Sequence, residues 1–467
     1  MSPPLALLLT LAFILWLLAR DLKARPSVSW AIWIPLLWLL IMGSRPMSMW
    51  LGIQQNVENA QLDGSPFDAS VYQLLIVAAL LVLIKRRVHW GGIIAENKGL
   101  FMFLSYLGMS AVWADYPFVA FKRWISYVAN IIFVLVILSE TNPVEAIGAV
   151  FLRFALILVP LSVVFIAYFP QLGRQWDPWG SQSLVGVTTN KNMLGITLLI
   201  SSIGLFWEMF ELHDDQTHAR KKFELFPCLL LVGIVFCLFL KVDTKTPFVC
   251  ALLVAGIILA VRFPSIKARI HRMEIYLLAL GLLFVLVNSA FDVSGMLIHA
   301  LGREEGLSGR SLIWQRELSA PINPLLGAGY YSFWLDPGRV DLVSEDFYYK
   351  LNEAHNGYIE TYLNEGLIGV FLLAALLIFA LRQIKRAMLN EEGVYPALRL
   401  AILVIGLFYN YTESAFDRTN PVWFAMLVAM VGRLPCWRVG QENGSDWLLK
   451  QATQKSLRAA QVPGASG

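Results

Sequence analysis

Charged residues are scarce in this sequence. They make up 15% of its 467 residues, against about 25% in soluble globular proteins. Hydrophobic residues make up 57% and gather in runs of about 16–25 residues, where roughly 20 are needed to cross a bilayer. Lipid offers the backbone no hydrogen-bonding partner, so each run has to be a helix. The composition therefore predicts an all-α, polytopic protein embedded in a membrane lipid bilayer.

Other absences exclude whole classes of function. The chain has four cysteines, three of them within apolar runs, and no Cys-x-x-Cys pair, so we interpret them as small apolar residues without a disulfide or metal role. No Walker loop and no Gly-x-Gly-x-x-Gly after a strand is present, which argues against ATP-driven work and dinucleotide chemistry. The net charge of +4 reflects membrane topology and does not indicate a nucleic-acid partner. We expect no cofactor and no metal.

The apolar runs predict about 12–13 transmembrane helices. Their expected ranges are 4–20, 29–43, 69–84, 98–113, 124–139, 145–168, 193–209, 225–241, 246–262, 274–291, 360–382, 397–412 and 420–435. The first run lacks the basic start and the cleavage site of a signal peptide, so we count it as a span.

The basic residues predict the sidedness of the loops, because Lys and Arg gather on the cytoplasmic side. The basic clusters fall in odd-numbered loops of this series, at 20–25, 85–87, 220–222, 262–272 and 382–386. The C-terminal tail is then cytoplasmic, and the long polar segment 292–357 is extracytoplasmic. The chain divides into N-terminal helices (1–291), an extracytoplasmic catalytic loop (292–359), C-terminal helices (360–436) and a cytoplasmic tail expected to be disordered (437–467).

Two motifs in the polar segment are candidates for chemistry. Arg310 follows Gly309 and precedes Trp314 by one helical turn. In the first turn of a short helix, its guanidinium would add bidentate phosphate recognition to free backbone N–H groups. The alternative is that Arg310 pairs with Glu304 or Glu305 and that Trp314 is an interfacial anchor.

The second motif is His355-Asn356-Gly357-Tyr358-Ile359-Glu360, which leads into an apolar helix. An imidazole with a pKa near neutrality can accept a proton at the water–lipid boundary. A helix-capping or structural role for His355 is the alternative. Gly327 and Gly329 are interpreted as tight-turn residues ahead of an aromatic cluster.

Cations on the predicted outer side are not explained by the topology rule. They cost desolvation at a helix end unless they pair or reach water, and together they suit an anionic ligand. Pairing with acids such as Asp115 or Asp243 is the alternative for each one. The set comprises Arg45, Lys122, Arg123, Arg174, Lys191, Lys241, Lys245, Arg303, Arg310, Arg316, Arg339 and Lys350.

Two further outer turns carry donors suited to a phosphate or a sugar hydroxyl. Asn190-Lys191-Asn192 stands just before a span, and Lys245 stands beside Thr246 at the start of another. Ordinary turn and cap roles explain both segments equally well.

Taken together, these motifs resemble those of the O-antigen ligase / Wzy-type polymerase superfamily of bacterial envelope glycosyltransferases. The chain is most similar to exopolysaccharide repeat-unit polymerases of the ExoQ type. The matching pieces are Gly309-Arg310-Ser311-x-x-Trp314, Pro324-Leu325-Leu326-Gly327-x-Gly329, His355-Asn356-Gly357-Tyr358-x-Glu360 with Gly366 and Gly369, Asn190-Lys191-Asn192, and Thr244-Lys245-Thr246.

The resemblance implies a GT-C-like fold with one large extracytoplasmic loop, in the bacterial inner membrane, with the active site on the periplasmic face. It implies metal-independent, inverting transfer from an undecaprenyl-diphosphate-linked oligosaccharide. A chain-length regulator is a further candidate partner.

The resemblance carries over roles for Arg310, Lys245 and His355, and the chemistry of the transfer suggests roles for the other candidates. His355, Arg310 and Glu360 are the expected catalytic residues. Arg310, Lys245, Arg123, Arg174 and Lys191 are expected to bind the diphosphate, and Asn190, Asn192, Asn356, Tyr358 and Trp314 the sugars.

The motifs do not separate a polymerase from a ligase that moves finished glycan to lipid A or protein. A transporter or flippase of lipid-linked sugars is the alternative of another class. It predicts ionisable residues deep in the membrane and a duplicated half, and we see no inverted repeat.

Overall fold

The computed structural model describes residues 1–53, 64–176, 180–214, 218–291, 307–347, 350–391, 393–416 and 418–432. The predicted tail therefore lies outside the described residues, as do Arg303, Glu304 and Glu305.

Helices dominate the described part, and the all-α class is confirmed. The elements are α1 (Pro3–Ala24), η1 (Trp30–Ile32), α2 (Trp33–Met42), α3 (Met47–Trp50), α5 (Pro66–Lys85), α6 (Trp90–Glu96), α7 (Lys98–Ser110), α8 (Pro117–Leu138), α9 (Pro143–Tyr168), α10 (Pro170–Gly173), β1 (Arg174–Trp176), β2 (Gln182–Leu184), α11 (Lys191–Asp214), α12 (His218–Val242), α13 (Lys245–Arg262), α14 (Pro264–Lys267), η3 (Ile270–Arg272), α15 (Met273–Phe291), α17 (Leu307–Leu318), η4 (Phe333–Leu335), α18 (Pro337–Val343), α19 (Gly357–Asn390), α20 (Tyr395–Thr412) and α21 (Pro421–Met430).

Each of the thirteen predicted spans coincides with a helix of the structure. Among the described residues, eight helices are long and apolar enough to cross a membrane: α1, α5, α8, α9, α11, α12, α13 and α19. The remaining predicted spans correspond to η1–α2, α7, α15, α20 and α21. The protein is thus a multi-pass membrane protein, as expected.

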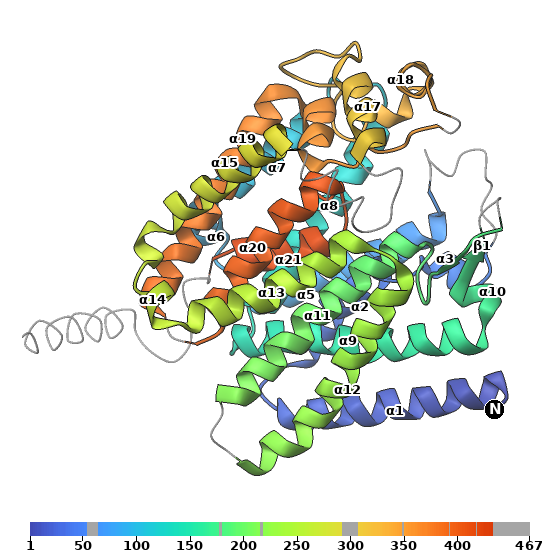
Figure 1. The fold of residues 1–467 in the computed structure, drawn as a ribbon, viewed down its shortest axis with the longest axis vertical. Helices are drawn as coiled ribbons and strands as arrows, with labels where there is room; N and C mark the ends of the chain where they lie inside the picture. Colours follow the sequence, from blue (N-terminus) through green and yellow to red (C-terminus); the bar gives the residue numbers. More distant parts are fainter. Residues whose placement is uncertain are drawn as a thin grey trace, which may run out of the picture.

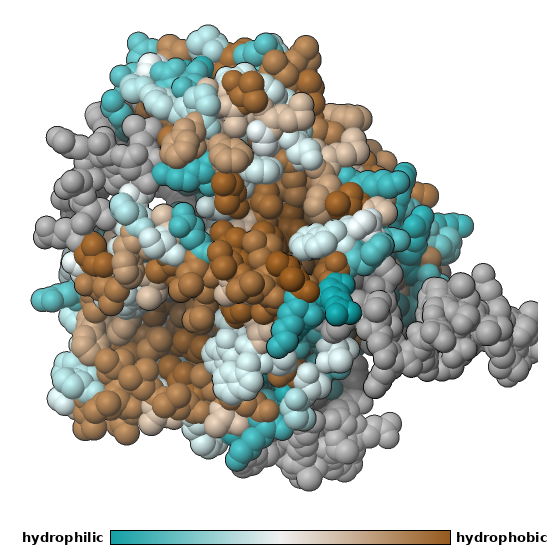
Figure 2. Space-filling model, turned by 180° about the vertical axis from the view of Figure 1, so that it is seen from behind, coloured by the Kyte–Doolittle hydropathy of each residue, from teal (hydrophilic) through white to brown (hydrophobic). Residues whose placement is uncertain are grey.

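The long helices run across the view in Figure 1, with α14 at one end and the β1–β2 hairpin at the other. Helices α17 and α18 lie together at the upper right of this view. Figure 2 shows a broad apolar area over the middle and lower left of the opposite face, with hydrophilic residues gathered toward the top and right. Leucines exposed on α1 and α5, such as Leu15 and Leu74, suit contact with lipid tails.

Helices α9 and α11 form the centre of the bundle, and both are largely buried. A network of buried charges joins them to α1. The Asp21 carboxylate accepts from Arg153 Nε at 2.6 Å and pairs with Arg25, which also pairs with Glu208. Because charges inside a bundle are costly unless paired, this network fixes α1 against the core.

The first part of α19 is shaped by close backbone packing. Gly366 interrupts the helix with a φ of 65°, and Gly327 in the facing loop has a φ of 68°. A Cβ on either glycine would lie within 2.4 Å of backbone atoms of the opposite segment, so both positions require glycine. Ala328 N donates to Leu363 O at 2.9 Å. The predicted tight turn is therefore confirmed, and it fastens the polar loop to the start of α19.

Candidate functional site

Arg310 lies in the first turn of α17, as the sequence predicts. Its Nη1 donates to the carbonyl oxygen of Thr412, and its Nη2 lies 3.1 Å from Glu413 Oε1. Both partners stand at the C-terminal end of α20. A guanidinium there also stabilises the negative end of the helix dipole, so Arg310 joins α17 to α20.

His355 lies in the turn that precedes α19. Asn356 caps this helix, because its Oδ1 accepts from the backbone N–H groups of Tyr358 and Ile359 at 3.0 and 3.2 Å. His355 itself has a φ of 49°, an unusual value for a residue other than glycine. Strained backbone of this kind concentrates at functional sites.

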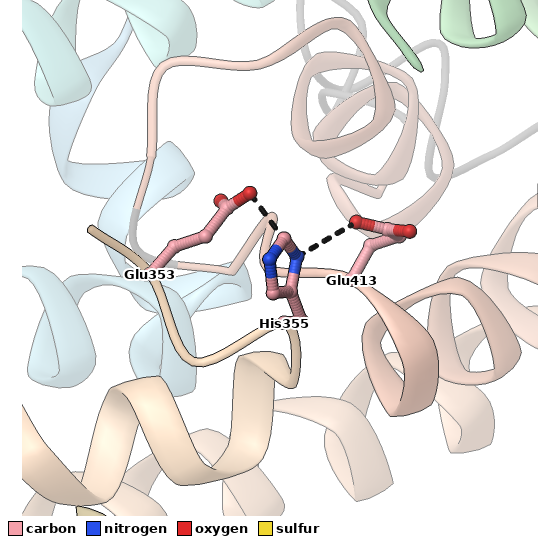
Figure 3. Close-up of side chains that lie close together, drawn as sticks. All are labelled: Glu353, His355 and Glu413. Carbon is pink, nitrogen blue, oxygen red and sulfur yellow. Dashed lines mark ion pairs between the residues drawn. The ribbon is translucent and has the colours of Figure 1, made fainter. Parts of the chain in front are cut away.

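The His355 ring stands between two carboxylates (Figure 3). Its Nδ1 is 3.2 Å from Glu353 Oε1 and 3.5 Å from Glu413 Oε2. Arg310 and His355 therefore approach different oxygens of the same Glu413 carboxylate. The sequence interpretation required these two residues to be close, and the structure brings them together.

Burial lowers the pKa of His355, but its contact with Glu413 and the charges of Glu353 and Glu413 outweigh burial, so the pKa is raised overall. Burial raises the pKa of Glu413, but the contact with His355 and the Arg310 charge outweigh burial, so that pKa is lowered. Each partner thus favours the charged form of the other. His355 is held as a strong proton acceptor by an ionised Glu413.

A second arginine, Arg418, completes the ionic arrangement. Its Nη1 is 2.7 Å from Glu353 Oε2, and its Nη2 is 3.1 Å from Glu360 Oε1. We call Arg310, Glu353, His355, Glu360, Glu413 and Arg418 the ionic cluster.

The ring of Tyr331 joins the ionic cluster to Arg123. Arg418 lies 5.8 Å from the centroid of this ring, and Arg123 lies 4.1 Å from it. Cation–π contacts of this kind hold a guanidinium without neutralising its charge.

Glu360 connects the ionic cluster to the backbone before α19. It is buried and accepts from Trp334 Nε1 at 2.7 Å and from the Ala354 backbone N–H at 2.8 Å. Trp314 Nε1 donates to the carbonyl oxygen of the same Ala354 at 2.9 Å. These bonds fix the backbone next to His355, which suits Glu360 to a positioning role.

A cavity of about 820 Å³ adjoins the cluster. Four predicted ligand-binding residues line it, together with three cluster members that carry charge. The lining includes Arg123, Asn190, Lys191, Asn192, Glu353, Glu413 and Arg418. Residues from α8, α11 and the loops before α19 and after α20 thus converge on one space. Arg310 and His355 do not line the cavity, but both contact Glu413, which does.

Other predicted ligand-binding residues lie outside this cavity lining. Arg174 Nε donates to the Ile166 carbonyl oxygen at 2.9 Å. Lys245 begins α13, beside Thr246, whose hydroxyl is 3.0 Å from the hydroxyl of Thr412. Lys245 is therefore next in the chain to Thr246, which contacts the same Thr412 that accepts from Arg310. Lys245 does not line the cavity.

Three residues predicted to bind sugars contribute polar groups to the fold. Asn356 caps α19 and donates to Tyr411 O at 3.2 Å, while Tyr358 Oη donates to Leu407 O at 3.1 Å. Trp314 bonds to Ala354. Their local roles are structural in the arrangement described.

Several of the cations that we predicted to lie outside the membrane are explained by pairing with a nearby acid. Arg339 Nη1 is 2.5 Å from Asp115 Oδ2, and Lys350 is 2.7 Å from Asp341. Arg316 pairs with Asp346. These pairs explain their cations without a ligand and narrow the set that could bind an anion.

The sequence interpretation found no acidic cluster, and the structure corrects it. Ligand atoms of Glu353, His355 and Glu413 lie within 4.8 Å of one another, close enough to hold a metal ion. Each carboxylate also pairs with a guanidinium through its other oxygen, so part of its negative charge is already balanced. The carboxylates come from segments distant in the sequence, which is why the pattern was not visible there.

Arg418, Glu413, Glu353 and Tyr331 are the site residues that sequence reasoning missed. A signal for Arg418 was present, since the loop between the last two predicted spans falls on the same side as segment 292–357. By the sidedness argument, Arg418 belonged among the outer cations.

Two comparisons with known proteins found similarity to this chain. Residues 228–374 match the family model described as O-Antigen ligase. The chain is also 26% identical over 322 residues to the Exopolysaccharide production protein ExoQ of Rhizobium meliloti (strain 1021), which covers 67% of this chain and 70% of the relative. The resemblance inferred from the motifs is confirmed. The matched domain contains Lys245, Arg310 and His355, whereas Glu413 and Arg418 lie beyond it.

Proposed function

We propose that this protein is a glycosyltransferase of the bacterial inner membrane that polymerises lipid-linked oligosaccharide repeat units on the periplasmic face. The observation that carries the proposal is the meeting of Arg310 and His355 on Glu413 at the edge of a large cationic cavity. The donor is an undecaprenyl-diphosphate-linked oligosaccharide, and the acceptor is a sugar hydroxyl of a second unit.

The leaving group determines what the site has to supply. Attack at the anomeric carbon breaks its bond to a diphosphate oxygen, so negative charge develops on the diphosphate. Fixed cations stabilise such charge most effectively. Arg123, Lys191 and Arg418 line the cavity, and Arg310 contacts Glu413, which also lines it. We assign Lys245, next to Thr246 at the start of α13, to the same anion. Arg174, on the strand that carries two further lining residues, would contribute at the entrance.

The acceptor hydroxyl has to lose a proton as its oxygen forms the new bond. His355 takes this proton, because Glu413 and Glu353 stabilise the imidazolium that results. Glu360 and Trp314 hold the His355 segment in place. Asn190 and Asn192 at the cavity wall offer donors to sugar hydroxyls.

The test is an assay with purified protein, a lipid-linked donor and no ion gradient. We expect His355→Ala and Arg310→Ala to leave single repeats, while Arg316→Ala makes polymer of normal length. Arg316 is the matched control because it lies on the same helix but pairs with Asp346. Full polymer length and yield from both site variants would refute the proposal.

The family description favours one alternative within the class, a ligase that transfers glycan to lipid A or to protein. Loss of a ligase leaves long unattached chains on the lipid carrier, whereas loss of a polymerase leaves single repeats. The chain-length ladder on lipid-linked product therefore separates the two functions.

Transport of lipid-linked sugars is the alternative of another class. The buried network of Asp21, Arg25, Arg153 and Glu208 is the kind of feature that it predicts. Transfer by purified protein without a gradient favours the enzyme, while movement of donor across vesicles without polymer would favour transport.

A further inference from the structure

Glu317 on α17 is a buried carboxyl group that the proposed reaction does not use. It is 0% exposed, and neither carboxyl oxygen has a hydrogen-bond partner among the residues that the structure describes. Burying an unpaired charge is very costly, so the position calls for a physical explanation.

Its place on the helix connects Glu317 to the ionic cluster. Arg310, Trp314 and Glu317 are spaced i, i+4 and i+7, so they share one face of α17. The opposite face carries the exposed residues Leu312, Gln315 and Leu318. Arg310 and Glu317 therefore lie on the same face of the helix, two turns apart.

The surroundings of Glu317 combine apolar side chains with negative charge. The apolar cluster packed around this region contains Ile313, Ala320, Ala328, Phe333, Val343, Leu351, Ala354 and Leu363. Burial, and then the charges of Glu360 and Glu353, raise the pKa of Glu317 to about 9. At neutral pH the group is therefore an uncharged acid.

The charged side chains of α18, which packs against α17, form ion pairs with residues other than Glu317. On α18, Arg339 pairs with Asp115 and Asp341 pairs with Lys350. Of the cations in the cluster, Arg310 and Arg418 are bound to carboxylates of Glu413, Glu353 and Glu360.

The charge balance of the cluster depends on this proton. With Glu317 uncharged and His355 neutral, as a general base has to be, three carboxylates face two guanidiniums, and the cluster carries one net negative charge. Ionisation of Glu317 would add a negative charge behind Glu353 and Glu360. It would bind both arginines more firmly in place and repel an incoming anion.

We propose that Glu317 is a positioning residue that carries a proton, so that Arg310 and Arg418 can exchange their carboxylate partners for the diphosphate of the donor. This inference rests on the proposed function, since it takes a polyprenyl diphosphate as the ligand. Helix α17 then contributes two residues to the site, Arg310 and Glu317.

The experiment measures the affinity of the purified full-length protein for undecaprenyl diphosphate between pH 7 and pH 10. In the wild type we expect affinity to weaken by about tenfold as Glu317 ionises, the size of effect that one unit charge has at short range in a protein. Glu317→Gln cannot ionise and keeps nearly the same shape. It should bind as the wild type does at pH 7 and lose this alkaline decline.

The control and the second readout make the test decisive. Glu345→Gln, an exposed position in the same region, should retain the full decline. An infrared band of a protonated carboxyl group, present in the wild type at pH 7 and absent from Glu317→Gln, would report the proton independently of ligand.

The outcomes separate this inference from the function beneath it. Binding whose alkaline decline persists in Glu317→Gln, or absence of the infrared difference, would overturn the role of Glu317 alone. Absence of diphosphate binding by the wild type at every pH would overturn the proposed function, and this inference with it.

Discussion

Arg310 and His355 approach different oxygens of one carboxylate, Glu413, at 3.1 and 3.5 Å. The two residues are 45 positions apart in the sequence, and their shared partner comes from a third segment, after α20. A guanidinium suited to an anion and an imidazole suited to a proton are thereby held side by side. Four predictions follow from how this arrangement is held together.

The first prediction concerns the pH dependence of Glu413→Gln. The Glu413 carboxylate helps to raise the pKa of His355, and a neutral amide would remove that support for the imidazolium. A general base works only when deprotonated, so the acid limb of kcat/KM should move to lower pH, by about one unit for a lost interaction of this kind. A pH–rate profile measures the shift. Glu345→Gln should leave the limb in place, and a shift to higher pH would contradict the role of Glu413.

The second prediction concerns the geometry of the cation at position 310. Arg310 uses two nitrogens, one on Thr412 O and one on Glu413. Lysine keeps the charge but not the fork. Arg310→Lys should raise the KM for donor by about tenfold, the equivalent of one lost charge-assisted hydrogen bond. Steady-state kinetics with Arg316→Lys as the control on the same helix checks this, and an unchanged KM would show that charge alone suffices.

The third prediction concerns Glu360, which orders the segment before α19. Its carboxylate accepts from Trp334, Ala354 and Arg418, and an amide nitrogen in its place would face a donor. Glu360→Gln should lower the free energy of unfolding by about 1–3 kcal/mol and reduce kcat more than KM. Thermal unfolding in detergent and kinetics measure the two effects. Normal kcat in a destabilised variant would limit Glu360 to a structural role.

The fourth prediction concerns divalent metal ions. Glu353, His355 and Glu413 are close enough to hold one, yet two arginines already neutralise the carboxylates. Treatment of the purified protein with a chelator should therefore leave the rate unchanged. Loss of activity that returns on addition of a single divalent ion would instead identify this trio as a metal site.

Much of the helical framework could be predicted because the bilayer restricts what an apolar run can become. Every predicted span, from 4–20 to 420–435, coincides with a helix. The first-turn position of Arg310 and the tight turn at Gly327 were also predictable, since both depend on local backbone preferences. The number of helices long enough to span was less predictable. Runs such as 98–113 form shorter helices, here α7, whose ends are decided by packing.

The site was predictable only in part. Residue types and sidedness pointed to Arg310, His355, Arg123 and Lys191, because a cation outside the membrane has no topological reason to be there. The sequence did not reveal which cations form ion pairs with nearby carboxylates, as Arg339 does with Asp115. That choice depends on distances between separate helices.

By itself the sequence determined that the protein is a helical membrane protein, because hydrophobic length and charge are properties of each segment. The tertiary structure alone decided that Glu353, Glu413 and Arg418 surround His355, and that Glu317 lies buried behind them. Ion pairs and pKa values depend on atoms a few ångströms apart. Those atoms come from different segments that meet only when the bundle is packed.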